Sequence, residues 1–141
     1  MLLKDKRIFM IEDSYVYAAL ASVYLRIEGA VIVVQSLAMN VPQVLKTHLP
    51  IDVILMDLVF ATSASGFDVF DEIRQVSELA EIPVVAVSAM DPAIAVTLAR
   101  QKGFAGLISK PFSSMIAGHV ARVLAGEQVW AAESWRPWVQ E

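Results

Sequence analysis

The 141-residue sequence contains no cysteine, which excludes disulfide bonds and thiolate metal sites. It also lacks a long apolar run. Although 57% of its residues are hydrophobic, charges interrupt every stretch before the roughly 18 residues that a membrane span needs. The first seven residues carry mixed charges and do not resemble a secretory signal. We therefore expect a cytoplasmic protein without a membrane span.

A basic stripe is also missing. The chain carries 11 basic and 15 acidic residues, and its net charge of −4 argues against broad binding of nucleic acids. We expect one domain over residues 1–126, followed by a tail at 127–141 that contains all three tryptophans, Trp130, Trp135 and Trp138. The tail is too short for an output domain and offers no helix that would read DNA. Its indoles either fold back onto the domain or form an aromatic anchor for a partner or a second subunit, which leaves a homodimer open.

Strand patterns and helix patterns alternate along the whole chain. Short apolar runs predict strands at residues 8–11, 31–34, 53–56, 84–87 and 106–108. Capping residues and helical spacing predict helices at residues 14–28, 39–47, 67–77, 92–102 and 113–125. This alternation is typical of an α/β fold with a doubly wound parallel sheet that has helices on both faces.

Polar side chains follow four of the predicted strands. The first strand ends at Glu12 and Asp13, the third at Asp57, the fourth at Ser88 and the fifth at Lys110. Because ligands of open parallel sheets bind beyond the carboxyl ends of the strands, we expect these five side chains to share one rim.

The three carboxylates at this rim form a set of hard oxygen ligands that suits Mg²⁺, with Mn²⁺ as an alternative. A single acid at a strand end is more simply a solvated side chain, but acids at two neighbouring strand ends favour a metal site. Asp57 could attack phosphorus as a nucleophile, while Lys110 neutralises the transferring oxygens and the Ser88 hydroxyl receives one of them. We expect Lys110 to be an exposed ammonium whose loss leaves the fold intact, and the peptide to Pro111 is a candidate for the cis form.

These motifs, in this order and spacing, resemble the receiver domain (CheY-like) of two-component response regulators. The resemblance covers residues 4 to 124 approximately and rests on Glu12-Asp13, Met56-Asp57, Val87-Ser88-Ala89 and Lys110-Pro111-Phe112. It implies a flavodoxin-like (βα)5 fold with strand order 2-1-3-4-5. It also implies a magnesium site made by Asp13, Asp57 and the backbone carbonyl of Val59, with Glu12 acting directly or through water.

The resemblance implies a function in phosphorelay signalling. Asp57 would take a phosphoryl group from a phosphohistidine, and the chain would be an enzyme only in catalysing its own phosphorylation and dephosphorylation. Partners would be a sensor histidine kinase or a histidine phosphotransfer protein, and a downstream protein. The donor would dock near the first helix, whose residues between Tyr15 and Leu25 are apolar nearly all round. That helix pattern is equally consistent with small alanines that merely face solvent.

Three positions depart from the family pattern. Ala61 stands where a proline is usual, Gly66 is displaced by one residue, and Leu107 replaces a switch aromatic. These departures leave open a pseudo-receiver that acts as an unphosphorylated interaction module. A flavodoxin-type cofactor binder is a weaker alternative, because no phosphate-binding loop follows the first strand. Because Leu107 is not aromatic, we expect Ser88 to shift the segment that follows it when Asp57 is phosphorylated. Output through the C-terminal tail is the alternative.

Overall fold

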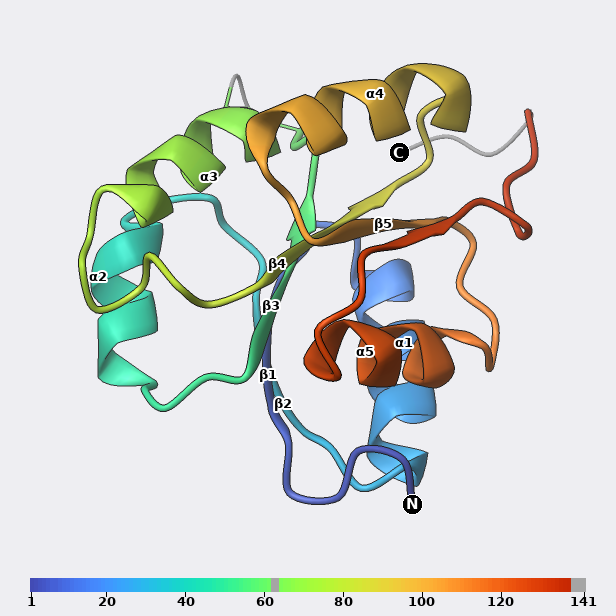
Figure 1. The fold of residues 1–141 in the computed structure, drawn as a ribbon, viewed down its shortest axis with the longest axis horizontal. Helices are drawn as coiled ribbons and strands as arrows, with labels where there is room; N and C mark the ends of the chain where they lie inside the picture. Colours follow the sequence, from blue (N-terminus) through green and yellow to red (C-terminus); the bar gives the residue numbers. More distant parts are fainter. Residues whose placement is uncertain (62–63, 138–141) are drawn as a thin grey trace.

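The computed structural model describes residues 1–61 and 64–137 of the chain. A parallel sheet with the order β2-β1-β3-β4-β5-β6 forms its centre (Figure 1). The strands are β1 (Arg7–Ile11), β2 (Val31–Gln35), β3 (Val53–Asp57), β4 (Val84–Ser88), β5 (Gly106–Ser109) and β6 (Val129–Ala131). The predicted flavodoxin-like order of the first five strands is confirmed, and β6 is an addition that the sequence pattern did not predict.

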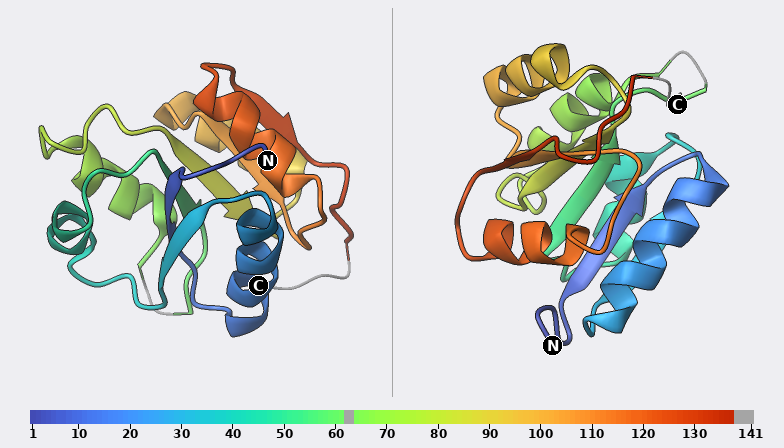
Figure 2. Two further views of the ribbon diagram at one scale, coloured as in Figure 1. Left: turned by 90° about the horizontal axis from the view of Figure 1, so that it is seen from below. Right: turned by 90° about the vertical axis from the view of Figure 1, so that its right-hand side faces the viewer.

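Five helices cover the two faces of the sheet, as expected. They are α1 (Tyr15–Ile27), α2 (Val41–Thr47), α3 (Gly66–Arg74), α4 (Pro92–Lys102) and α5 (Ile116–Leu124). Helices α1 and α5 lie on one face, and α2, α3 and α4 on the other (Figures 1 and 2). Each face has its own apolar core, one centred on α1 and α5 and the other on α2, α3 and α4.

Local sequence signals explain where several helices begin and end. The Ser14 hydroxyl accepts a hydrogen bond from the Tyr17 amide and caps α1. Asp91 caps α4 in the same way before Pro92, and the helix ends at Gly103 in a left-handed conformation that favours glycine. The boundaries of α4 therefore match the prediction, whereas α3 ends three residues before and α5 begins three residues after the predicted limits.

The sixth strand depends on a glycine in its neighbour. Gly106 of β5 pairs with Val129 of β6, and a Cβ at position 106 would overlap the carbonyl oxygen of Val129. The tail therefore folds back onto the domain, with Val129 and Ala131 buried and Trp130 half-buried. Trp138, which the sequence analysis grouped with the other tryptophans, lies outside the described residues. Among the residues described, no helix is both long enough and apolar enough to cross a bilayer.

Candidate functional site

The four strand ends bring the five predicted site residues to the same edge of the sheet. Asp57 and Ser88 are the last residues of β3 and β4, which are adjacent strands. Glu12 and Asp13 follow β1 on one side of this pair, and Lys110 follows β5 on the other. The parallel register thus creates the rim that the sequence pattern predicted.

An acidic cluster occupies the centre of this rim. Oxygens of Glu12, Asp13 and Asp57, one from each carboxylate, all lie within 4.8 Å of one another. Glu12 and Asp57 are buried, and Asp13 is half-buried. Beside the cluster lies a hollow of about 320 Å³ whose lining includes Asp13 and Val59. Three close carboxylates repel one another, so the cluster favours a bound cation.

The cluster fits a hard divalent cation such as Mg²⁺. All its donors are oxygens, and the adjacent hollow has room for the water molecules that Mg²⁺ retains. Both oxygens of Glu12 are already engaged, Oε1 with the Lys110 ammonium at 2.6 Å and Oε2 with the Ser14 amide at 3.0 Å. Asp13 and Asp57 are therefore the better candidates for direct ligands, with Glu12 acting through water.

The prediction that Lys110 is an exposed ammonium at the rim is wrong, because this side chain is completely buried. Its Nζ lies 2.6 Å from Glu12 Oε1 and 3.3 Å from Asp57 Oδ1. The ammonium also lies 4.7 Å from the centre of the Tyr17 ring, a cation–π contact from α1. A buried charge held by two carboxylates matters for stability, so replacing this lysine should not leave the fold unaffected. The Lys110–Pro111 peptide is cis, as predicted.

The Ser88 hydroxyl is buried and takes part in the loop that follows it. Its oxygen accepts a hydrogen bond from the Met90 amide at 2.9 Å. This bond closes a tight turn around Ala89, of the kind that serine side chains commonly make with a backbone N–H two residues on. In this structure the Ser88 hydroxyl is therefore hydrogen-bonded to the loop that follows it.

Two described residues after β3 contact the acidic residues, although both depart from the family pattern. The Ala61 amide donates a hydrogen bond of 2.6 Å to Asp13 Oδ2. The displaced Gly66 packs against the backbone of Asp57, where a Cβ would overlap the Asp57 carbonyl oxygen. The Gly66 amide also donates to the carbonyl of Leu58 at 3.0 Å. Gly66 thus packs closely against Asp57 from its displaced position. Thr62 and Ser63 lie outside the described residues.

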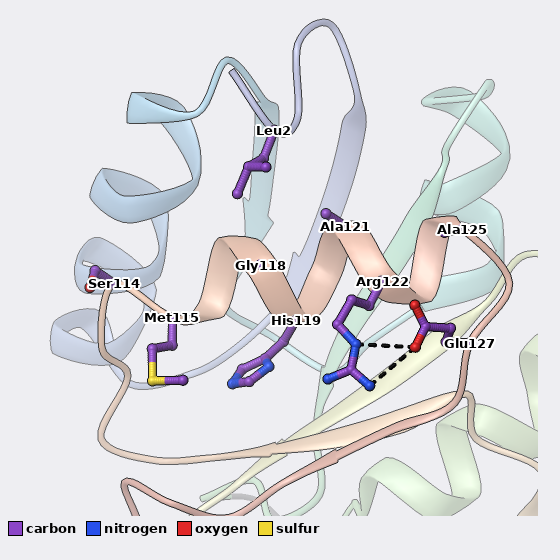
Figure 3. Close-up of a pocket in the computed structure, with 9 residues that line it drawn as sticks. All are labelled: Leu2, Ser114, Met115, Gly118, His119, Ala121, Arg122, Ala125 and Glu127. Atoms are coloured by element: carbon purple, nitrogen blue, oxygen red, sulfur yellow. Dashed lines mark hydrogen bonds and ion pairs between the residues drawn. The ribbon is translucent and has the colours of Figure 1, made fainter.

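A larger hollow of about 660 Å³ lies along α5, and its lining includes no residue of the acidic cluster (Figure 3). None of the predicted site residues lines it. Its polar side chains include His119, which pairs with Glu133 at 2.6 Å, and Arg122, which pairs with Glu127 at 3.1 Å. This hollow and the rim are therefore lined by different residues.

Two contacts near the site could not be predicted from the sequence pattern. The first is the Tyr17 ring, which lies 4.7 Å from the Lys110 ammonium, whereas the sequence pattern indicates only an apolar position of the first helix. The Trp135 indole N–H donates to the carbonyl of Ala89 at 2.9 Å, a contact across 46 residues that no local pattern signals.

The first helix has a strongly apolar exposed face. Tyr15, Val16, Val23 and Ile27 expose between 55% and 87% of their surface. Large side chains, and not only small alanines, therefore face outward along α1, and Tyr15 and Val16 do so in the turn that follows the rim. A face of this kind is typical of an interaction surface.

Comparisons with known proteins agree with this geometry. A family model described as "Response regulator receiver domain" matches residues 8–116. No curated protein matches the chain.

Several solved structures share the fold. They include a response regulator from Desulfuromonas acetoxidans, with 24% identity, a TM-score of 0.74, and coverage of 85% of this chain and 97% of that chain. The chemotaxis protein CheY4 of Vibrio cholerae has 16% identity, a TM-score of 0.74 and coverage of 85% and 98%. A response regulator receiver domain protein from Clostridium thermocellum has 19% identity, a TM-score of 0.70 and coverage of 86% and 92%. The structural likenesses show the fold, and the family match shows that this chain belongs to the response regulator receiver domain family.

Proposed function

We propose that the chain is a magnesium-dependent phosphoacceptor of two-component signalling, with Asp57 as the residue that is phosphorylated. One observation carries the proposal: a buried aspartate at the end of a central strand lies within 4.8 Å of two further carboxylates and 3.3 Å from a buried lysine. A carboxylate nucleophile, a cation at 3.3 Å and an acidic cluster that suits a metal are the parts that phosphoryl transfer requires.

The transfer step balances on this chain's own groups. An Asp57 carboxylate oxygen attacks the phosphorus of a phosphohistidine and forms an acyl phosphate. The P–N bond breaks, its electron pair stays on the imidazole nitrogen, and that nitrogen takes a proton. Lys110 neutralises charge on the phosphoryl oxygens, and the Ser88 hydroxyl donates a hydrogen bond to one of them. Water then attacks the phosphorus, the P–O bond to Asp57 breaks, and inorganic phosphate is released as the carboxylate is restored.

Asp13, Asp57 and the Val59 carbonyl would hold the cation, with Glu12 acting through water. Bound Mg²⁺ would supply further positive charge to offset the negative charge of the transferring phosphoryl oxygens. Beyond this self-catalysed transfer and hydrolysis, we propose no enzymatic activity.

The exposed apolar face of α1 is the surface on which we expect the phosphoryl donor to dock. We propose that a histidine kinase or a histidine phosphotransfer protein docks on Tyr15, Val16 and Val23. Tyr15 and Val16 are exposed in the first turn of α1, which follows the rim residue Asp13, and Val23 is exposed farther along the same helix. Output would be a contact with a downstream protein. The support for the partners is the family and the surface together.

Intact mass after incubation with a small phosphodonor and Mg²⁺ tests the function. The wild-type protein should gain the mass of one phosphoryl group, and Asp57→Asn should gain none. Asp68→Asn is the matched control, because Asp68 is an exposed aspartate of α3 outside the cluster, and it should be phosphorylated normally. A wild type that stays unmodified would favour the pseudo-receiver, an interaction module that works without phosphorylation.

A further inference from the structure

The last described residues of the chain form a segment along the outer edge of β5. We define the C-terminal strap as residues 129–137, which begin with β6 and run past the end of β5 (Figure 1). Two consecutive side chains of the strap bind the backbone near the rim. The Ser134 hydroxyl donates to the carbonyl of Ser109 at 2.9 Å, and the Trp135 indole N–H donates to the carbonyl of Ala89 at 2.9 Å.

These two carbonyls lie next to two residues of the site. Ala89 directly follows Ser88, and Ser109 directly precedes Lys110. The strap is therefore bonded to both strand ends that supply the hydroxyl and the ammonium. The strap is far from the rim in sequence, but the two carbonyls that it contacts are each one residue away from Ser88 or Lys110, the residues that would contact a phosphoryl group.

The two ends of the strap differ in how firmly they are held. β6 pairs with β5 over three residues, and Arg100 of α4 lies 4.7 Å above the Trp130 ring. Val129 and Ala131 are buried in the core shared with α5. Trp135 is only half-buried, and Arg136 and Pro137 are exposed. Movement of the Ala89 carbonyl would therefore release Trp135 while β6 stays in the sheet.

We infer that the C-terminal strap senses the phosphorylation state of Asp57 and that phosphorylation releases Trp135 from Ala89. The inference rests on the proposed function. The Ser88 oxygen now accepts from the Met90 amide, so the Ala89 peptide sits inside a turn that this bond closes. When the hydroxyl moves toward a phosphoryl oxygen on Asp57, the turn opens and the Ala89 carbonyl moves away from the indole. The released Trp135 then offers an aromatic side chain to a partner.

Coupling of this kind works in both directions. If the indole holds the loop in its unphosphorylated arrangement, removing that hydrogen bond should favour the phosphorylated arrangement. A single hydrogen bond contributes a net stabilisation that corresponds to an affinity change of about 2- to 10-fold. Trp135→Phe, which keeps the ring but lacks the N–H, should therefore bind a phosphoryl mimic about 2- to 10-fold more tightly.

The test uses the full chain with beryllofluoride and Mg²⁺. Fluorine NMR measures binding of beryllofluoride, and hydrogen exchange measures the protection of the Trp135 amide, which donates to the Ala132 carbonyl at 3.1 Å. We expect beryllofluoride to accelerate exchange at Trp135 and not in β6, and Trp135→Phe to bind it more tightly. Trp130→Phe is the matched control, because the Trp130 ring faces Arg100, and its affinity should stay within about twofold of the wild type.

The outcomes separate the two proposals. If beryllofluoride binds but either the exchange at Trp135 or the affinity of Trp135→Phe is unchanged, the inference about the strap is wrong and the phosphoacceptor function stands. If beryllofluoride fails to bind in the presence of Mg²⁺, the phosphoacceptor function is wrong and the inference falls with it.

Discussion

Replacing Lys110 with alanine should strongly destabilise the fold. The substitution removes an ammonium that is completely buried and lies within 3.3 Å of two carboxylates that are also buried. Removing one partner of such a group leaves uncompensated charge in the interior and costs about 3–5 kcal/mol. A chain of this length has a total stability of about 7–21 kcal/mol, at roughly 0.05–0.15 kcal/mol per residue. The variant should therefore fold, but with a much smaller free energy of unfolding.

Urea denaturation in a buffer without divalent cations measures the effect. With an m value of about 2 kcal/mol/M, the midpoint should fall by about 1.5–2.5 M. Lys102→Ala is the matched control, because its Nζ also lies 2.6 Å from a carboxylate, that of Asp71, but both side chains are at least 37% exposed. An exposed pair of this kind contributes only about 0–1 kcal/mol, so that midpoint should hardly move.

Magnesium adds a second expectation for the same variant. A cation bound by Asp13 and Asp57 replaces part of the positive charge that Lys110 supplied, so Mg²⁺ should stabilise Lys110→Ala more than it stabilises the wild type. Equal midpoints for Lys110→Ala and Lys102→Ala would refute the claim that the buried ion pairs stabilise the rim.

Three further predictions follow from the structure. Mg²⁺ at ten times its dissociation constant should stabilise the wild type by about 1.4 kcal/mol and so raise its melting temperature. Asp13→Ala should remove most of this rise. A wild-type melting curve that Mg²⁺ leaves unchanged would contradict the metal site. Gly66→Ala should lower the free energy of unfolding, measured with urea, by at least about 1–3 kcal/mol, because its Cβ would overlap the Asp57 carbonyl. Gly118→Ala, on α5 with open space around its Cβ, should instead raise it by up to about 1 kcal/mol. Equal effects of the two substitutions would refute the packing role of Gly66. Partial burial raises the pKa of Glu133, but hydrogen bonds from its own backbone amide and His119 outweigh this, so its pKa lies below 4.5. The stability that this carboxylate contributes is therefore present above pH 4.5 and is lost as the pH falls through the lowered pKa, so the wild type should lose more stability than Glu133→Gln during acid titration monitored by circular dichroism.

Local patterns were sufficient to predict the fold and the position of the rim. Apolar runs that end in polar residues located Asp57, Ser88 and Lys110, because the carboxyl ends of parallel strands meet at one edge. Helix α4 could be placed to the residue because Pro92 and Gly103 mark its two ends. In each case the signal lies within a few residues of the feature that it predicts.

Features that depend on long-range packing could not be predicted in this way. The burial of Lys110 requires Glu12 and Tyr17 to approach from another part of the chain, and no pattern around residue 110 signals them. The β6 strand has only three residues and depends on the absence of a side chain at Gly106, 23 residues before Val129. The contact of Trp135 with Ala89 follows from the position of that strand.

The most direct test of the account identifies the phosphorylated residue itself. After treatment with a small phosphodonor and Mg²⁺, borohydride reduces an aspartyl phosphate to homoserine, and peptide mapping then locates the modified position. We predict homoserine at position 57 alone, with Glu12 and Asp13 unmodified. A phosphoryl group on Asp13, on His48 or His119, or on no residue would contradict the central claim that Asp57 is the phosphoacceptor.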